Sequence, residues 1–328
     1  MKKLLILALL FGLATPLYAQ KTVLKVATLA PEGSMWMKVL NKLKAKLKKD
    51  SNNRIKLRVY AGGVLGDDKV VISKMRLGQV DAASLTGVGL GSILPEIRVM
   101  EIPFQILTYR QYDCVLPQLQ KRFEKKLKEK GFIVLGWADQ GFVYMMSRQK
   151  ITKADDIKKT KPWVWEGDPL AAGVFRIFGI NPVPLSLQDV FTSLQTDLID
   201  TVYITPVAAI ALQWNTKLKY IINQPIVDGL GALVITKKAF DAMPEDLKSI
   251  LVKDVSRYMK ILGKYTRKFN TKSLKVLQKK GMKMLPSSAA QAKIFQQNGI
   301  KAAYKLVGTL FSKEFLEQTR KIINKCAQ

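Results

Sequence analysis

The sequence predicts an α/β fold whose sheets are mixed and mainly parallel. Three segments rich in β-branched residues, 23–28, 55–60 and 80–85, are separated by segments with helical periodicity. A helix between two strands returns the chain to the same edge of a sheet, so these strands are expected to be parallel. About 309 residues follow position 19, which is more than one compact core usually holds, so two lobes are expected.

Local signals define the elements of the first half. Ser34 is suited to cap a helix, because it precedes apolar residues that recur every three or four positions. Asn52–Asn53 is typical of the turn after this helix. The acidic pair Asp67–Asp68 marks the start of a second helix, which stops at Gly78. This half is therefore expected to open with a βαβαβ unit, with ligands beyond the carboxyl ends of its strands.

A second α/β unit is expected from Ile151 onward, followed by a helical region. No repeat, low-complexity run or flexible linker separates the two units, so ordered crossing strands are expected to join them. From Pro244 to about Lys280 an amphipathic pattern predicts one long helix. The other predicted elements are, in order, a short helix that starts at 154–156, a strand at 163–165, a helix at 169–178, an extended segment at 182–185, a helix at 187–196 and a strand at 200–203.

Residues 1–19 have the pattern of a secretory signal peptide. Lys2 and Lys3 precede the apolar run Leu4–Ala14, and Leu17–Ala19 places a small residue at the cleavage position. The run has about 11 residues, whereas a membrane-spanning helix needs about 20. No cysteine follows the cleavage position directly, which argues against lipid attachment. The mature chain is thus expected to be soluble and exported to a periplasm.

The charge of the chain is strongly positive, with a formal net charge of +29. A charge of this size can indicate nucleic-acid binding, but the lysines are scattered along helical faces without interleaved aromatic residues. A nucleic-acid partner is therefore not expected. A general attraction to anions and to acidic membrane surfaces is expected instead.

The residue types available limit the chemistry. The chain contains no histidine, which removes Ser/His/Asp and Cys/His catalytic sets and the commonest zinc ligand. The acidic pairs at 67–68 and 155–156 stand at helix starts, where carboxylates cap N–H groups. We therefore predict no enzyme, metal site or cofactor, and an exported hydrolase would lack a nucleophile and base. Cys114 and Cys326 could pair in an oxidising compartment, but their spacing does not decide whether they meet.

Several segments resemble the DctP-type solute-binding proteins of TRAP transporters. The similarity covers nearly the whole mature chain in the same order, which makes it more specific than any single motif. The segments are LKVATLAPEGS, LGDD, MRLGQVDAASL and PEIRVMEIPFQI in the first half, and ITKADDIKKTKPWVW and GINPVPLSLQDVFTSLQTDLIDTVYITP in the second.

The resemblance implies a two-lobed periplasmic binding protein fold, in which hinge strands join the lobes and a long helix braces them. The implied boundaries are 20–143 with 231–270 for lobe I, and 144–230 with 271–328 for lobe II. The resemblance also implies a receptor that closes on a small solute and delivers it to TRAP-type integral membrane subunits. The alternative is a periplasmic shuttle protein of the same fold that carries a lipid or other hydrophobic cargo.

Members of that family hold a ligand carboxylate with an arginine, whose guanidinium donates two parallel hydrogen bonds. Trp163 occupies the matching position in this chain. Three further matched positions, often polar in the family, hold Leu29, Val143 and Thr205. These departures lead us to expect a ligand that is apolar or amphipathic and is not a simple carboxylate. A place for Trp163 in the core of its lobe is the alternative interpretation.

Other candidate ligand-binding residues lie at strand ends, at a helix start and beside the matched positions. Thr86 and Gly87 follow a strand, and the residues around Ser34 offer free helix N–H groups. Trp165 shares a face with Trp163 if their segment is extended. Each also has an ordinary interpretation as part of a loop, cap or hinge. The full candidate set is Leu29, Glu32, Ser34, Trp36, Thr86, Gly87, Gln140, Val143, Trp163, Trp165, Leu187, Tyr203 and Thr205.

Overall fold

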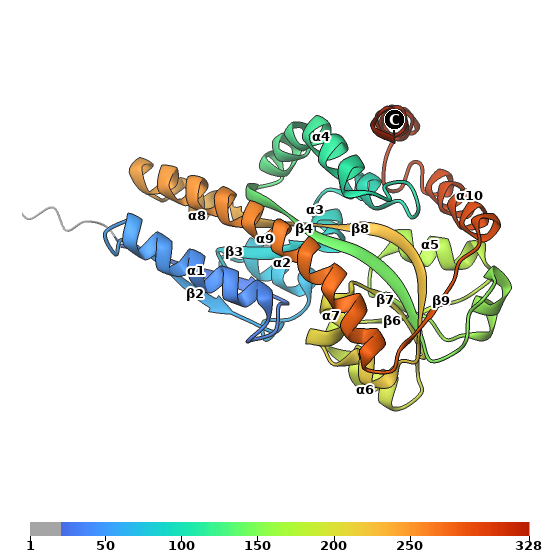
Figure 1. Cartoon of the computed structure of the whole chain (residues 1–328). Helices are drawn as coiled ribbons and strands as arrows, with labels where there is room; N and C mark the ends of the chain where they lie inside the picture. The colour runs from blue at the N-terminus through green and yellow to red at the C-terminus, as the bar shows by residue number, and fades with distance from the viewer. Residues whose placement is uncertain (1–20, 328) are drawn as a thin grey trace, which may run out of the picture.

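The computed structural model describes residues 21–327, and Figure 1 shows them as two lobes joined by long strands. Residues 1–19, the expected signal peptide, lie outside the described residues. Between positions 21 and 327, no helix is both long enough and apolar enough to cross a membrane. The α/β fold with mixed sheets is confirmed.

The first lobe is built on three parallel strands. β1 (Thr22–Thr28) pairs in parallel with both β2 (Ile55–Tyr60) and β3 (Ala82–Thr86), which confirms the predicted βαβαβ unit. α1 (Met35–Asp50) begins where expected, because the side chain of Ser34 accepts a backbone hydrogen bond from its first turn. The other helical elements of this lobe are α2 (Asp68–Arg76), α3 (Gly87–Ile93), the 3-10 segment η1 (Pro95–Glu101) and α4 (Tyr109–Glu129).

Two long strands cross from one lobe to the other. β4 (Phe132–Ser147) and β8 (Tyr220–Thr236) pair antiparallel along most of their length. They stand in a seven-stranded sheet whose main path runs β2, β1, β3, β8, β4, β7. β7 (Thr201–Ile204) is antiparallel to β4, and β9 (Lys283–Leu285) is parallel to β8. A shift of register at Asp139–Gly141 marks a bulge in β4, and bulges bend the strands that carry them.

The second lobe has a small sheet of its own. β5 (Trp163–Trp165) and β6 (Val183–Leu185) pair in parallel, and both lie where the sequence predicted extended segments. The helix expected at 187–196 is a 3-10 turn, η3 (Leu187–Asp189), that continues into α6 (Val190–Gln195). The other elements of this lobe are η2 (Ala154–Lys159), α5 (Pro169–Ile177), α7 (Pro206–Ala211), η4 (Trp214–Lys217) and α10 (Ala289–Lys305).

α9 (Glu245–Lys279) is the long helix that the sequence predicted, and it follows the short helix α8 (Lys237–Asp241). It has 35 residues and packs against β4, α1 and α7, so it contacts both lobes. Asn270 fixes it at the hinge, because its side chain accepts a hydrogen bond from the N–H of Val207 and donates one to the carbonyl of Phe142. The bracing role implied for this helix therefore has a structural basis.

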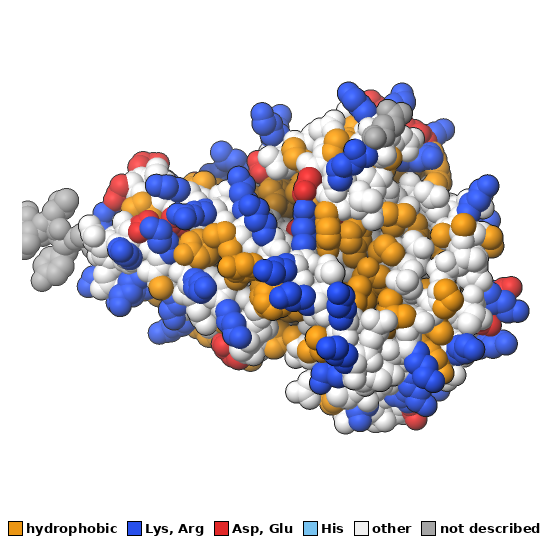
Figure 2. Space-filling model, viewed as in Figure 1, with side chains coloured by type: hydrophobic (Ala, Val, Ile, Leu, Met, Phe, Trp, Pro, Cys, Tyr) orange, Lys and Arg blue, Asp and Glu red, His pale blue; other side chains and the backbone are white. Residues whose placement is uncertain are grey.

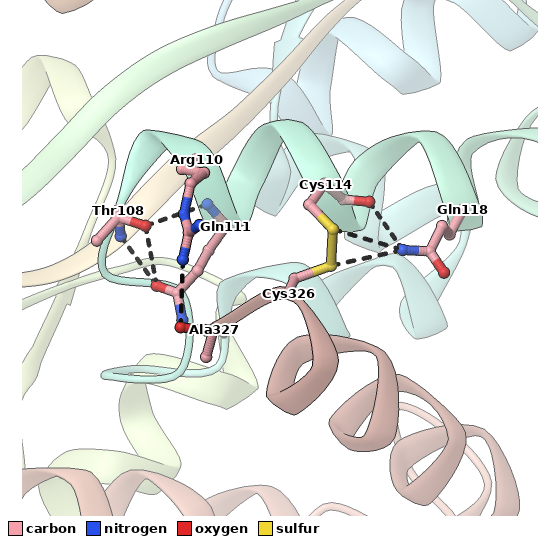
Figure 3. Close-up of a disulfide and its surroundings, with 7 residues drawn as sticks. All are labelled: Thr108, Arg110, Gln111, Cys114, Gln118, Cys326 and Ala327. Atoms are coloured by element: carbon pink, nitrogen blue, oxygen red, sulfur yellow. Dashed lines mark hydrogen bonds between the residues drawn. A yellow bond between two sulfur atoms is a disulfide. The ribbon is translucent and has the colours of Figure 1, made fainter.

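The last helix returns to the first lobe. α10 packs on α5, whereas α11 (Lys313–Ala327) packs on α4 and places Phe315 and Leu316 in the core of the first lobe. A disulfide between Cys114 and Cys326 joins α11 to α4 (Figure 3), so the pairing that the sequence left open is present. We propose that residues 313–327 belong with lobe I, in place of their expected assignment to lobe II.

Candidate ligand-binding cavity

A cavity of about 260 Å³ lies between the two lobes. Its wall includes Thr28 and Thr86, at the carboxyl ends of β1 and β3, and Trp165 and Tyr203 from the second lobe. Gln140 of the hinge strand β4 also lines it. The carboxyl ends of parallel strands are where α/β sheets usually bind ligands. The cavity therefore lies where the sequence predicted the ligand.

Aromatic rings form a cluster in the cavity wall. Phe295 of α10 stacks on Phe104 with ring centroids 5.4 Å apart, and its ring lies 5.7 Å from that of Phe178. The rings of Phe175 and Tyr203 are 6.3 Å apart. All five side chains line the cavity. Such faces bind apolar groups through dispersion and area burial and offer few polar partners.

Arg98 provides a positive charge in the cavity wall, and this charge is already paired. Its Nη2 donates to both carboxylate oxygens of Asp168, at 3.0 and 2.8 Å, and its Nη1 pairs with Glu101. Arg98 comes from η1 in the first lobe and Asp168 from the start of α5 in the second, so the contact crosses the cleft. Asp168 also accepts hydrogen bonds from the N–H groups of Leu170 and Ala171 and thereby caps α5.

The three charged groups share a site with little access to water. The exposed fraction is 6% for Arg98, 8% for Glu101 and 4% for Asp168. Burial raises the pKa of Glu101 above its usual value, although Arg98 and the N–H of Leu230 favour the charged form. Burial also lowers the pKa of Arg98, but the carboxylates of Asp168 and Glu101 outweigh this effect and the net shift is upward. A guanidinium bound by two carboxylates has little capacity left for a third.

Two glycines of α3 make room for this cluster. A Cβ atom on Gly87 would lie 2.0 Å from Oε2 of Glu101, and one on Gly91 would lie 2.5 Å from Cδ of Arg98. A larger residue at either position would have to move the charged side chain, because protein interiors are close-packed. The GVGLG sequence of this helix thus permits two charged side chains to pack against its backbone.

Asp67 makes a second contact across the cleft. Its Oδ2 accepts a hydrogen bond of 2.6 Å from Nε1 of Trp165 and one of 3.2 Å from the N–H of Leu187, while its Oδ1 caps α2. The side chain of Gln188 donates a 3.3 Å hydrogen bond to the carbonyl of Gly63 nearby. These contacts join the lobes directly, so the structure shows the closed arrangement.

Two carboxyl groups lie together at the hinge. Asp139 of β4 lines the cavity, and Asp228 of β8 is within hydrogen-bonding reach of it. Asp228 is 1% exposed, and neither of its oxygens has a hydrogen-bond partner among the described residues. Burial and the charge of Asp139 raise the pKa of Asp228 well above its usual value, while Arg267 of α9 pairs with Asp139 and with Asp113. The upward shift of its pKa favours the protonated form of Asp228.

Metal binding has no structural support in the part of the chain at positions 21–327. No group of three or more His, Cys, Asp or Glu side chains there is arranged to hold a metal ion.

Ten of the thirteen predicted ligand-binding residues line the cavity. They come from both lobes and from the hinge strands. Trp165 and Leu187 have a second role, because both also donate hydrogen bonds to Asp67. The ten are Leu29, Trp36, Thr86, Gly87, Gln140, Val143, Trp165, Leu187, Tyr203 and Thr205.

Three predicted residues, Trp163, Glu32 and Ser34, lie outside the cavity wall. Trp163 is fully buried, with its ring 5.1 Å from that of Tyr203, and its Nε1 donates to the carbonyl of Leu185. Ser34 uses its hydroxyl to cap α1, and Glu32 is exposed in the turn before that helix. Trp163 therefore supports the wall through Tyr203 and does not face the cavity itself.

Sequence reasoning missed the residues that enter the cavity from η1 and α10. Arg98 and Glu101 stand in a segment that carried the resemblance, and their spacing of three residues places them on one face of a helical turn. That spacing does not predict that Arg98 and Glu101 are buried together. Phe104 and Phe295 are distant in the chain, and no local pattern brings them into contact.

Comparison with known sequences gives a match over most of the chain. The model of the bacterial extracellular solute-binding protein family 7, DctP, matches residues 26–307. The C4-dicarboxylate-binding periplasmic protein DctP of Rhodobacter capsulatus is 24% identical over 282 residues, which cover 84% of this chain and 83% of that protein.

Solved structures with the same fold include receptors with bound ligands. The sugar acid binding protein DctPAm of Advenella mimigardefordensis, in complex with galactonate, has a TM-score of 0.88 at 22% identity and covers 94% of this chain and 99% of its own. A TRAP periplasmic solute-binding protein of Ralstonia eutropha, with bound (S)-2-acetolactate, has a TM-score of 0.86 at 21% identity over 93% of this chain and 99% of its own. At these identities the likeness establishes the fold.

Proposed function

The chain belongs to family 7 of the bacterial extracellular solute-binding proteins, and from this premise we propose that it is the periplasmic receptor of a TRAP-type importer. Its family consists of extracytoplasmic binding proteins, so the chain is a receptor and not an enzyme. In the proposed role it closes on a small ligand and passes it to integral membrane subunits. The fold shared with a TRAP receptor of Ralstonia eutropha supports this role.

The proposed ligand is apolar or amphipathic and is not a simple carboxylate. The observation that carries this proposal is the pairing of Arg98 with Asp168 and Glu101. No other lysine or arginine in the described part of the chain lines the cavity. A ligand carboxylate would have to displace Asp168, and leaving a buried charge without its partner costs about 3–5 kcal/mol.

This ligand differs from those of the structural relatives. Galactonate and (S)-2-acetolactate, which the Advenella and Ralstonia proteins bind, are both acids. The reason for the departure lies in the cavity of this chain, whose lining includes the carboxyl groups of Glu101, Asp139 and Asp168 beside one arginine. Arg98 pairs with Asp168 and Glu101, and Arg267 pairs with Asp139, so an additional ligand carboxylate would meet no unpaired cation among the described lining residues.

Apolar and aromatic residues from both lobes would hold the proposed ligand. Leu29 and Trp36 contribute from the first lobe, Val143 from the hinge, and Trp165 and Tyr203 from the second lobe. Burial of apolar ligand surface contributes roughly 25 cal/mol per Å² before the costs of association are subtracted. The amide of Gln140 remains to orient a hydroxyl or carbonyl of the ligand, whereas the hydroxyls of Thr86 and Thr205 already cap α3 and α7.

Ligand binding between the lobes would shift the population toward the closed form. The cross-cleft contacts of Asp168 with Arg98 and of Asp67 with Trp165 would then add to the stability of that form. A periplasmic shuttle could use the same cavity, but family membership favours import.

Thermal melting of the mature protein tests the proposal. A ligand that binds only the native state, at about 100 times its Kd, stabilises it by about 2.7 kcal/mol. We expect Tm to rise with neutral aromatic or long-chain alcohols and to stay constant with succinate and galactonate. Native mass spectrometry of the protein as purified should also show a bound apolar molecule. Micromolar binding of a small dicarboxylate, with no stabilisation by apolar compounds, would overturn the ligand proposal.

A further inference from the structure

Positively charged side chains form a continuous row along the outer face of α9. The row continues to Lys253 at one end and to Lys279 at the other, and all its members are exposed. Successive members are three or four residues apart, which places them on one face of a helix. We call this row the α9 stripe, and its central members are Arg257, Lys260, Lys264, Lys268, Lys272 and Lys275.

The α9 stripe is not neutralised by the described part of the protein. None of its side chains forms an ion pair with a residue in 21–327, where the other salt bridges of α9 involve Lys248, Asp246 and Arg267. The acidic residues of α9 are Glu245 and Asp246, in its first turn, and Asp254, which is buried. Like charges three or four residues apart destabilise a helix. Repulsion within the stripe therefore lowers the stability of the helix, and binding of an anionic partner would reduce this repulsion.

Exposed apolar side chains run beside the stripe. Tyr265 and Phe269 are each 40% exposed, and Val276 is 39% exposed. Each follows a stripe lysine directly in the sequence, so the two rows lie side by side on the helix. The two rings contact each other edge to face, with centroids 6.4 Å apart. A basic face with exposed aromatic residues along its edge is typical of helices that lie on a membrane surface.

The position of α9 leaves the stripe on the outside of the molecule. The opposite face of the helix is buried, and Met259 and Leu262 on it line the cavity. In Figure 1 the helix crosses the front of the molecule, and Figure 2 shows lysine and arginine side chains over the same region, with hydrophobic surface between them. From Lys253 to Lys279 the helix is about 39 Å long at 1.5 Å per residue.

We propose that the α9 stripe docks the receptor on an anionic phospholipid bilayer, with Tyr265 and Phe269 entering the headgroup layer. A long row of cations on one helix matches the negative charge of such a surface. The exposed rings at the edge of the stripe distinguish this surface from a purely electrostatic one, because aromatic side chains favour the membrane interface. Docking in this way holds the receptor at the membrane whichever ligand it carries.

Vesicle flotation of the mature protein tests the proposal. The vesicles are of phosphatidylcholine, with or without about 30 mol % phosphatidylglycerol, in about 50 mM and about 500 mM NaCl. The test variant is the triple change Lys268→Glu, Lys272→Glu, Lys275→Glu. The matched control is Lys121→Glu, Lys125→Glu, Lys128→Glu on α4, where three exposed lysines have the same spacing and the net charge changes by the same amount.

The native protein is expected to float with anionic vesicles at low salt and to remain unbound with neutral ones. The α9 variant should lose at least tenfold in apparent affinity, whereas the α4 control should lose less than twofold. A third variant, Tyr265→Ser with Phe269→Ser, should lose the binding that survives at high salt. Circular dichroism melting confirms that each variant is folded. Equal losses in the α9 and α4 variants, or native protein that binds heparin but not anionic vesicles at the same salt, would overturn the proposal.

Discussion

The indole of Trp165 is hydrogen-bonded to the carboxylate of Asp67 across the cleft, with 2.6 Å between Nε1 and Oδ2. The acceptor is the capping residue of α2 in the first lobe, and the donor stands at the end of β5 in the second. One residue of the cavity wall therefore also fixes the relative position of the lobes.

Trp165→Phe should favour the open form, because it keeps an aromatic ring and removes the indole N–H. A hydrogen bond to a charged group contributes about 1.5–3 kcal/mol, so the ratio of closed to open protein should fall by about tenfold or more. Small-angle X-ray scattering of the ligand-free protein should show a larger radius of gyration. Trp137→Phe is the control, because it removes an indole N–H that is 2.8 Å from Glu124 within the first lobe. If both variants expand equally, the contact with Asp67 does not hold the lobes together.

Asp168→Asn should give the cavity an affinity for carboxylates. The change removes the charge that occupies Nη2 of Arg98, while Glu101 still pairs with Nη1. Succinate or galactonate should then raise Tm in the variant and leave the native protein unchanged. The comparison variant is Asp197→Asn, whose exposed carboxylate pairs with Arg148 outside the cavity wall. Stabilisation of the native protein by these acids to the same extent would show that Arg98 is available without the change.

Trp163→Arg should destabilise the protein and should not create a carboxylate site. Trp163 is fully buried and its ring lies 5.4 Å from that of Trp214, so a guanidinium there would be an unpaired buried charge. We expect the free energy of unfolding to fall by about 4 kcal/mol or more, against about 1–3 kcal/mol for Trp163→Phe. Urea unfolding measures both values. A well-folded arginine variant that binds succinate would return Trp163 to the ligand-binding set.

The stability of the protein should depend on the protonation of Asp228. In the folded state its pKa is raised by burial and by Asp139, whereas an unfolded aspartate has a pKa of about 3.9. The folded state therefore binds the proton more tightly than the unfolded state does. The resulting contribution to the free energy of unfolding is fully present below about pH 4 and is lost as the pH rises toward the folded pKa. Asp68 contributes in the same direction, because burial raises its pKa to about 7. The neighbouring charges at the hinge are those of Arg267 and Asp113.

Asp228→Asn should remove this part of the pH dependence, because an amide has nearly the same shape as the carboxyl group and does not titrate. The variant should gain stability relative to the native protein as the pH rises above about 4. Melting curves from about pH 5 to about pH 8 test this, with Asp155→Asn as the control because Asp155 is fully exposed. A difference between the Asp228 variant and the native protein that does not change with pH would mean that Asp228 is ionised when folded.

The sequence predicted the elements of this fold well, because their signals are local. The strand at 55–60 and the long helix from 245 occur where alternation and amphipathic spacing placed them. Ser34 caps its helix as expected. These features depend on neighbours within four residues, and propensity and capping act at that range.

The candidate site could be predicted only in part, because it depends on contacts between distant segments. Thr86 was predicted to contact the ligand because it follows a strand, and Gln140 because it lies beside a position matched to the family. Both line the cavity. Trp163 matched the arginine position of the family, yet its side chain is directed into the core by packing against Tyr203. The pairing of Arg98 with Asp168 joins residues 70 positions apart, and no periodicity encodes such a pair.

The disulfide has a consequence for the range of motion of the two lobes. α10 packs on the second lobe and α11 on the first, and only residues 306–312 connect them. Seven extended residues reach about 24 Å at most. Cys326 fixes the far end of α11 to α4. While both helices stay packed, the lobes therefore cannot separate further than the length of residues 306–312 allows. The disulfide thus adds a covalent anchor to the packing of α11 on the first lobe, at one end of the segment that limits how far the cleft can open.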